Sequence, residues 1–112
     1  MNGVYGIAQW FPGRGDAPEL GPAESEFLAA YSDVAEGSPD YPAVQAVAGA
    51  VLATRCAELA GSLDRSALWE AAAGLETSTL FGEFKIDPTT GAQVRHTPVL
   101  VRWRDGALQL AP

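Results

Sequence analysis

Apolar residues recur at a helical spacing between residues 23 and 75 and at a strand-like spacing toward both ends of the chain. The period of 3.6 residues predicts a first helix that begins at Ala23 and stops before Gly37 and Pro39. Its apolar positions are Phe27, Leu28, Tyr31, Val34 and Ala35. Glu24 and Glu26 fall in its first turn, where acidic side chains favour the positive end of the helix dipole.

A second predicted helix begins near Pro42 and ends at Gly61, and a third is capped by Asp64 and ends at about Gly74. The periodic apolar positions of the second helix are Val44, Val47, Ala48, Val51, Leu52, Cys56 and Leu59. Alanines fill much of its remaining surface, so almost every side is small or apolar. Such a helix is expected to have neighbours on nearly all sides.

Short strands are predicted at residues 3–8, 83–87 and 98–104, where apolar residues alternate with polar ones or form a short buried run. Asp105-Gly106 is a strong signal for a two-residue hairpin turn. The expected register pairs Arg104 with Ala107, Trp103 with Leu108 and Val101 with Leu110. An isolated two-stranded ribbon is only marginally stable, so this hairpin should pack against something else.

The loop predicted at residues 12–22 is rich in Pro and Gly and contains the tripeptide Arg14-Gly15-Asp16. Adhesion receptors read this tripeptide, but such short motifs recur by chance. We interpret Gly15 as a turn residue.

Composition indicates one globular domain rather than a disordered chain, since 47% of the 112 residues are hydrophobic and 19% are charged. The net charge of −7, with Lys85 as the one lysine, argues against a nucleic-acid surface and favours repulsion from anionic membranes. Cys56 is the one cysteine, so no internal disulfide can form. The first residues have no signal-peptide pattern.

Residues that could support catalysis or metal binding are few and scattered, and we expect neither an enzyme nor a cofactor. His96 is the one histidine and is expected at the surface or at a strand edge, and Cys56 is expected to be an inert buried thiol. Acidic pairs drawn from Glu19, Glu24 and Glu26 are read as solvated residues at a helix entrance. Glu83, Asp87 and His96 carry metal-ligand groups without the spacing of a metal site.

Four aromatic residues adjoin the boundaries of predicted elements, namely Trp10, Phe11, Tyr41 and Phe81. Rings at such boundaries line ligand pockets or fill the core, and the pattern leaves both readings open.

The order of motifs resembles the C-terminal third of the type I solute-binding proteins of ABC importers, the branched-chain amino acid and amide group. The resemblance rests on GVYGIAQWF from Gly3, the EFxxxY pattern of Glu26 to Tyr31, DYPAVQA from Asp40, TLFGEFKID from Thr79 and PVLVRW from Pro98. It implies a partial two-lobed α/β fold of the periplasmic-binding-protein type, with three helices, short strands and a C-terminal β-hairpin. Residues 10–79 would belong to the N-terminal lobe, and residues 1–9 and 80–112 to the hinge and the C-terminal lobe.

The resemblance implies a non-catalytic protein that binds an amino acid or amide between two lobes and serves an ABC permease outside the cytoplasm. Tyr41 matches an aromatic position that lines the pocket in this family. Most of the ligand cradle comes from segments that would precede this chain, so we expect no ligand binding by this chain alone. The alternative is a small interaction protein that forms a homodimer through its apolar second helix.

Overall fold

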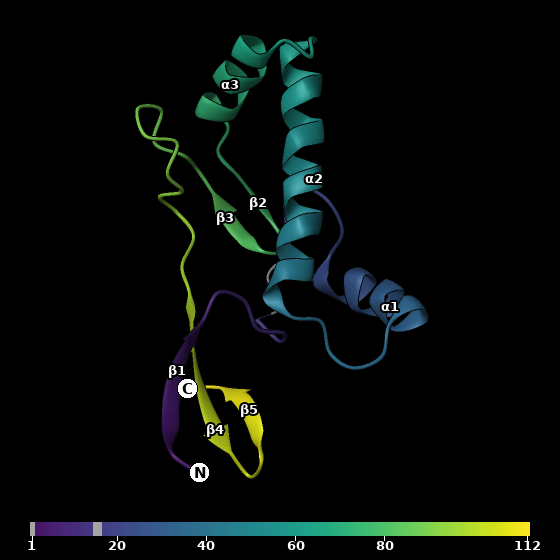
Figure 1. Cartoon of the computed structure of the whole chain (residues 1–112), viewed down its shortest axis with the longest axis vertical. Helices are drawn as coiled ribbons and strands as arrows, with labels where there is room; N and C mark the ends of the chain where they lie inside the picture. Colours follow the sequence, from purple (N-terminus) through teal and green to yellow (C-terminus); the bar gives the residue numbers. More distant parts are fainter. Residues whose placement is uncertain (1, 15–16) are drawn as a thin grey trace.

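The computed structural model describes residues 2–14 and 17–112, which form a mixed α/β structure with three helices and two small sheets (Figure 1). The elements are, in order, β1 (Val4–Ala8), α1 (Glu24–Val34), α2 (Tyr41–Ala60), α3 (Arg65–Gly74), β2 (Thr77–Thr79), β3 (Gly82–Phe84), β4 (Val99–Arg104) and β5 (Ala107–Leu110). The predicted α/β class and the three predicted helices are therefore confirmed.

Strands β1, β4 and β5 form one antiparallel sheet in the order β1-β4-β5, which we call the sheet unit. The predicted hairpin register is confirmed, because Trp103 pairs with Leu108 and Val101 with Leu110. Asp105 and Gly106 have φ values of 52° and 79°, as a two-residue turn between twisted strands requires. The hairpin obtains the support it needs from β1, which pairs along the other side of β4.

The remaining elements form what we call the helical unit, in which α2 and α3 pack together and the hairpin of β2 and β3 runs beside them (Figure 1). Sequence patterning missed β2, because its three residues, Thr77 to Thr79, contain no apolar alternation. The predicted strand at residues 83–87 is also shorter than expected. It ends at Phe84, and Ile86 forms only an isolated bridge with Gln93.

The ends of α2 follow from its flanking residues. The Asp40 side chain accepts a hydrogen bond from the backbone N–H of Tyr41 at 2.7 Å. Pro42 lies in the first turn, where its missing N–H costs nothing. Gly61 adopts a left-handed conformation with φ of 60°, and its N–H bonds to the carbonyl of Ala57. Asp64 precedes α3 as predicted but forms no side-chain capping bond.

The core lies where the helical unit meets the segment that leaves β1. It contains four buried side chains from four separate segments, namely Trp10, Phe27, Val44 and Leu80. Val44 is fully buried. Cys56 lies apart from this cluster and is buried, as predicted, and burial raises the pKa of its thiol.

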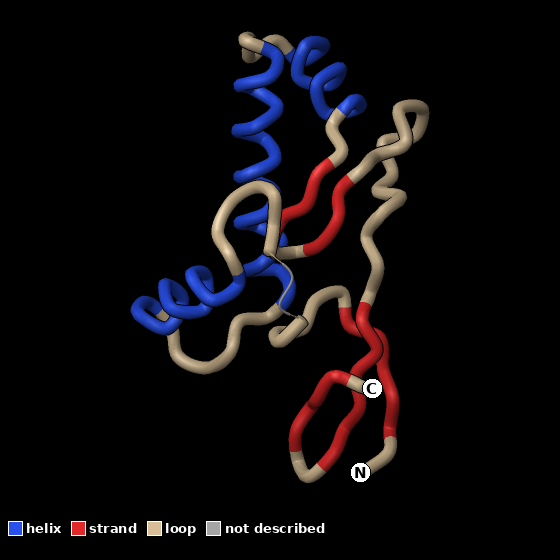
Figure 2. The backbone as a smooth tube through the Cα atoms, turned by 180° about the vertical axis from the view of Figure 1, so that it is seen from behind, coloured by secondary structure: helices blue, strands red, loops and turns tan. Residues whose placement is uncertain are grey.

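The chain is more extended than a compact domain of its size. Its accessible surface is 7209 Å², whereas a folded monomer of 11.7 kDa is expected to expose about 5,900 Å². Its radius of gyration is 16.0 Å against about 13 Å for a compact domain of this length. Figure 2 shows the sheet unit projecting away from the helices, with the two units joined by loops.

The neighbours that the sequence predicts on nearly all sides of α2 are not supplied by the described residues. Only 17% of its most apolar stretch is buried, and Tyr41 and Leu59 are 40% and 50% exposed. The helix is long and apolar enough to cross a membrane, a property that core helices of soluble proteins share. The apolar composition of α2 therefore suits packing partners beyond those that residues 2–14 and 17–112 provide.

Gly21 offers a test of how the first long loop packs against α2. Its φ is 77°, and an added Cβ would lie 2.8 Å from Cγ2 of Val51. Gly21→Ala should lower the free energy of unfolding by about 3 kcal/mol, from backbone strain and overpacking together. Urea denaturation measures this loss.

Gly37→Ala is the matched control, because Gly37 has a similar φ of 80° and open space around its Cα. It should cost about 1 kcal/mol, from strain alone. Equal losses in the two variants would show that the loop does not pack on Val51.

Candidate functional site

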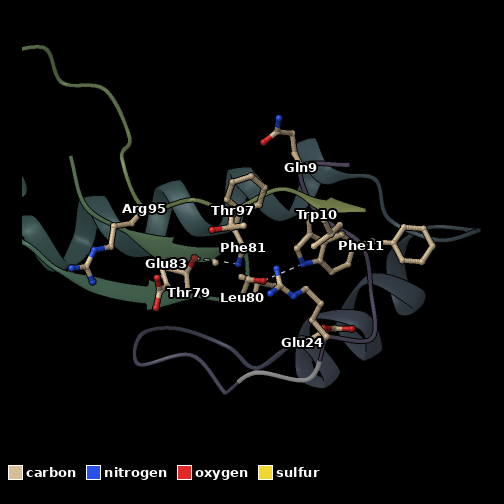
Figure 3. A pocket seen from close by; sticks show the side chains of 13 residues that line it. Gln9, Trp10, Phe11, Glu24, Thr79, Leu80, Phe81, Glu83, Arg95 and Thr97 are labelled. Carbon is tan, nitrogen blue, oxygen red and sulfur yellow. Dashed lines mark hydrogen bonds between the residues drawn. The ribbon is translucent and has the colours of Figure 1, made fainter. Parts of the chain in front are cut away.

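The best-formed pocket among the described residues lies at the junction between the sheet unit and the helical unit (Figure 3). Its volume is about 290 Å³, close to the lower limit for small-molecule sites. The pocket is built by four stretches: residues 9–14, which follow β1; Glu24, at the start of α1; residues 79–83, at the β2–β3 turn; and residues 95–99, which lead into β4.

Trp10 fixes the apolar wall of this pocket. Its indole is 8% exposed, and Nε1 donates a hydrogen bond to the backbone carbonyl of Leu80 at 3.1 Å. The turn that carries Leu80 is itself held by the Thr79 hydroxyl, which accepts from the N–H of Phe81 at 3.2 Å. Both bonds can be followed in Figure 3. These two hydrogen bonds fix the indole to the turn and satisfy polar groups in the wall.

Charged groups of both signs surround the pocket. Arg95 and Glu83 lie toward one side in Figure 3, and Glu24 lies toward the other. Arg95 is half-exposed and forms an ion pair with Glu76, whereas Glu24 accepts from the backbone N–H of Gly13 at 2.7 Å. The pocket thus presents the guanidinium of Arg95 and the carboxylates of Glu83 and Glu24 around the apolar wall.

His96 lies in one of the two stretches of chain that connect the units, and its side chain contacts the other stretch. Its ring stacks on Phe81 with centroids 4.3 Å apart, and Nε2 lies 2.9 Å from the carbonyl of Gln9. Because a carbonyl only accepts, Nε2 carries the hydrogen and donates it. Nδ1 is buried and has no hydrogen-bond partner among the described residues. His96 was expected at the surface or at a strand edge; it lies three residues before β4 and is partly buried, because the stack on Phe81 covers one face of the ring.

Gly82 makes room for this histidine. Its φ is 138°, and an added Cβ would lie 3.0 Å from Nδ1 of His96. A glycine is therefore required here on both conformational and steric grounds.

Three of the four aromatic residues at predicted boundaries line the pocket, namely Trp10, Phe11 and Phe81. Trp10 also belongs to the core, so the two readings that the sequence left open both apply to it. Tyr41 occupies the first position of α2 and does not line this pocket as the described residues form it. Its contact with a ligand stays a prediction.

The remaining candidates are not brought together as a catalytic or metal site. No cluster of three metal-ligand side chains occurs within residues 2–14 and 17–112. Asp87 instead closes its own loop by accepting from the N–H groups of Thr90 and Thr89, at 3.0 and 2.7 Å, which lowers the pKa of its carboxyl group. Gly15 and Asp16 of the Arg-Gly-Asp tripeptide lie outside the described residues.

The pocket residues missed by sequence reasoning are polar ones on irregular segments, namely Gln9, Arg14, Arg95 and Thr97. Such positions carry no periodic signal, because only the meeting of distant segments gives them a shared location.

The pocket thus lies between two units that are joined by loops. A sequence model of the periplasmic binding protein family matches residues 1–107. The chain belongs to that family. Neither the comparison with curated proteins nor the comparison with solved structures gave a match.

Membership of the periplasmic binding protein family places the chain among proteins that bind small solutes outside the cytoplasm and work with transporters. Such proteins are typically not enzymes. The mixed α/β structure, with three helices and small sheets, is consistent with a partial fold of this family.

The indole of Trp10 allows the junction to be tested. Trp10→Phe keeps a ring in the core but leaves the Leu80 carbonyl without its donor. We expect the free energy of unfolding to fall by about 2 kcal/mol, because a buried acceptor loses its hydrogen bond. Chemical denaturation measures the change.

Trp69→Phe is the matched control, because Trp69 is 45% exposed and lies outside the core cluster. It should cost less than about 0.5 kcal/mol. A similar loss in both variants would contradict the role given to the Trp10 hydrogen bond.

Proposed function

We propose that this chain is the C-terminal portion of an ABC-importer solute-binding protein for small amino acids or amides. The observation that carries the proposal is the junction pocket, where Arg95, Glu83 and Glu24 surround the aromatic side chains of Trp10 and Phe81. It supplies one wall of the site, and the rest of a two-lobed fold supplies the other.

The chemistry of the pocket suits a ligand with a charged or polar head and a small apolar body. A guanidinium recognises a carboxylate through charge-assisted hydrogen bonds, and a carboxylate recognises an ammonium group in the same way. The rings of Trp10, Phe11 and Phe81 favour an aliphatic side chain. Amino acids combine these three features, and aliphatic amides share a polar head and a small apolar body.

Open surfaces in both units support the proposal that further lobes complete this site. The outer face of the sheet unit carries Tyr5, Ile7 and Leu100, which are 57%, 75% and 50% exposed. On the same face, Nε of Arg102 is buried and has no hydrogen-bond partner among the described residues. Together with the exposed surface of α2, these groups suit packing against further protein.

The division of the chain at residues 79 and 80 between two lobes remains part of this proposal. The permease as partner of this chain and the location of this chain outside the cytoplasm are also part of the proposal. The connections at residues 9–10 and 79–80 would then be the points about which the lobes close on a ligand.

Calorimetric titration with aliphatic amino acids and with aliphatic amides tests the proposal. We expect no binding to the 112-residue chain alone, because a pocket with one wall leaves most of the ligand in water. In the assembled two-lobed protein, Arg95→Gln should weaken binding by about 10- to 100-fold through loss of a charged hydrogen bond.

Arg55→Gln is the matched control, because Arg55 is also half-exposed and paired with an acid, Glu58, but lies outside the pocket. It should leave affinity unchanged. Tyr41→Ala tests the remaining predicted contact and should also weaken binding. Unchanged affinity in Arg95→Gln, or equal losses in the Arg95 and Arg55 variants, would remove the pocket from the proposed function.

The second candidate function is a self-associating interaction protein. The exposed apolar surface of α2 favours it, because apolar helix faces are commonly covered by another chain. This candidate predicts a stable symmetric dimer of the chain and no solute binding in any assembly. Light scattering on the purified chain separates it from the solute-binding proposal.

A further inference from the structure

His96 lies behind the wall of the junction pocket rather than in it. The residues on either side of it, Arg95 and Thr97, line the pocket together with Val99, whereas His96 does not (Figure 3). This alternation is that of an extended segment, in which successive side chains point to opposite sides. The side chain of His96 is therefore placed to hold the wall from outside the cavity.

The contacts of His96 join three of the four stretches that build the pocket. His96 belongs to the stretch that leads into β4. Its Nε2–H donates to the carbonyl of Gln9, in the stretch that follows β1, and its ring lies on Phe81, at the β2–β3 turn, with 3° between the ring planes. Gln9 and Phe81 themselves line the pocket. One side chain thus sets the spacing of these three stretches.

The surroundings of the two ring nitrogens select one tautomer of His96. Nε2 carries the hydrogen, because the carbonyl of Gln9 can only accept. Nδ1 is buried, has no hydrogen-bond partner among the described residues, and faces Gly82, where an added Cβ would lie 3.0 Å away. A hydrogen on Nδ1 would be buried there without an acceptor, which is unfavourable. The ring therefore has a fixed orientation as well as a fixed place.

Trp10 and His96 attach the sheet unit to the helical unit at two different points. Trp10 lies in the core and attaches the stretch that follows β1. His96 is only partly buried and attaches the stretch that leads into β4, through its stack on Phe81. With Trp10 alone the sheet unit could rotate about a single attachment, whereas a second attachment fixes its orientation.

We propose that His96 is a positioning residue of the junction pocket. Its contacts with Phe81 and Gln9 hold the stretch that carries Arg95 in one place against the aromatic side chains. The inference rests on the proposed function, in which the guanidinium of Arg95 recognises the carboxylate of the ligand. His96 itself touches no ligand and acts through the residues on either side of it.

NMR of the 112-residue chain tests the contacts of the ring. His96 is the one histidine, so a sample with nitrogen-15-labelled histidine gives the signals of this ring alone. We expect a visible Nε2–H signal, because the hydrogen bond slows its exchange with water, and nuclear Overhauser contacts from the ring to Phe81. A hydrogen on Nδ1, or an Nε2–H that exchanges as fast as that of a solvent-exposed ring, would overturn the proposal.

The distance between spin labels on β5 and on α2 tests the orientation of the two units, in a Cys56→Ala background that removes the native thiol. Gln109 and Gln45 are exposed and lie outside the pocket, so labelled cysteines at these positions leave the junction intact. We expect one narrow distance distribution. His96→Ala should abolish it in favour of a broad one, because the second attachment is lost.

Two further variants separate the contacts of His96 and do not depend on the folding of His96→Ala. His96→Phe keeps a ring beside Phe81 but has no donor, whereas His96→Gln keeps a donor but has no ring. Each should broaden the distribution less than His96→Ala does.

Trp69→Ala is the control for a general loss of packing, because Trp69 lies beside Gly91 within the helical unit. It should leave the distance distribution narrow. An unchanged distribution in His96→Ala, or equal broadening in Trp69→Ala, would overturn the proposal.

Ligand titration distinguishes this inference from the proposed function. In the assembled two-lobed protein, His96→Phe should weaken the binding of aliphatic amino acids by about tenfold or more, through misplacement of Arg95. If Arg95→Gln weakens binding and the His96 variants do not, the pocket stands and the role of His96 is wrong. If neither residue affects binding but His96→Ala broadens the distance distribution, the proposed function is wrong and the orienting role of His96 stands.

Discussion

The position of Trp10 between the two units is the constraint on which the rest of the structure depends. Extensive contacts between elements occur within each unit: β1 with β4, β4 with β5, α2 with α3, and β2 with β3. The junction therefore relies on side chains in the connecting segments. Trp10 packs with Phe27, Val44 and Leu80 and donates its indole N–H to Leu80, so one residue orients β1 relative to the helices.

Local sequence patterns correctly predicted the elements whose conformation depends on residues close together in the sequence. The period of α2, the left-handed Gly61 and the Asp105-Gly106 turn depend on neighbouring residues, and each appears in the structure where the sequence predicted it. Strand β2 and the contacts of His96 were not predicted. Both depend on contacts between segments far apart in the sequence, such as the bond from His96 to Gln9.

The candidate site was only partly predictable for the same reason. Aromatic residues at element boundaries pointed to Trp10, Phe11 and Phe81, because rings at such positions either pack or bind. The charged members of the pocket lie on irregular segments without periodicity. Their shared location follows from the junction, which lies within residues 1–107, the stretch that the family model matches.

Pairing of β1 with β4 also sets the order in which the molecule can form during synthesis. Val4 pairs with Trp103, so β1 has no partner strand until almost the whole chain has been made. At about 5 to 20 residues per second, an emerging β1 waits roughly 5 to 20 s for β4. During that interval β1, as an uncharged apolar strand, is a ready substrate for chaperones. The helical unit can fold first, because all its elements precede β4 in the sequence.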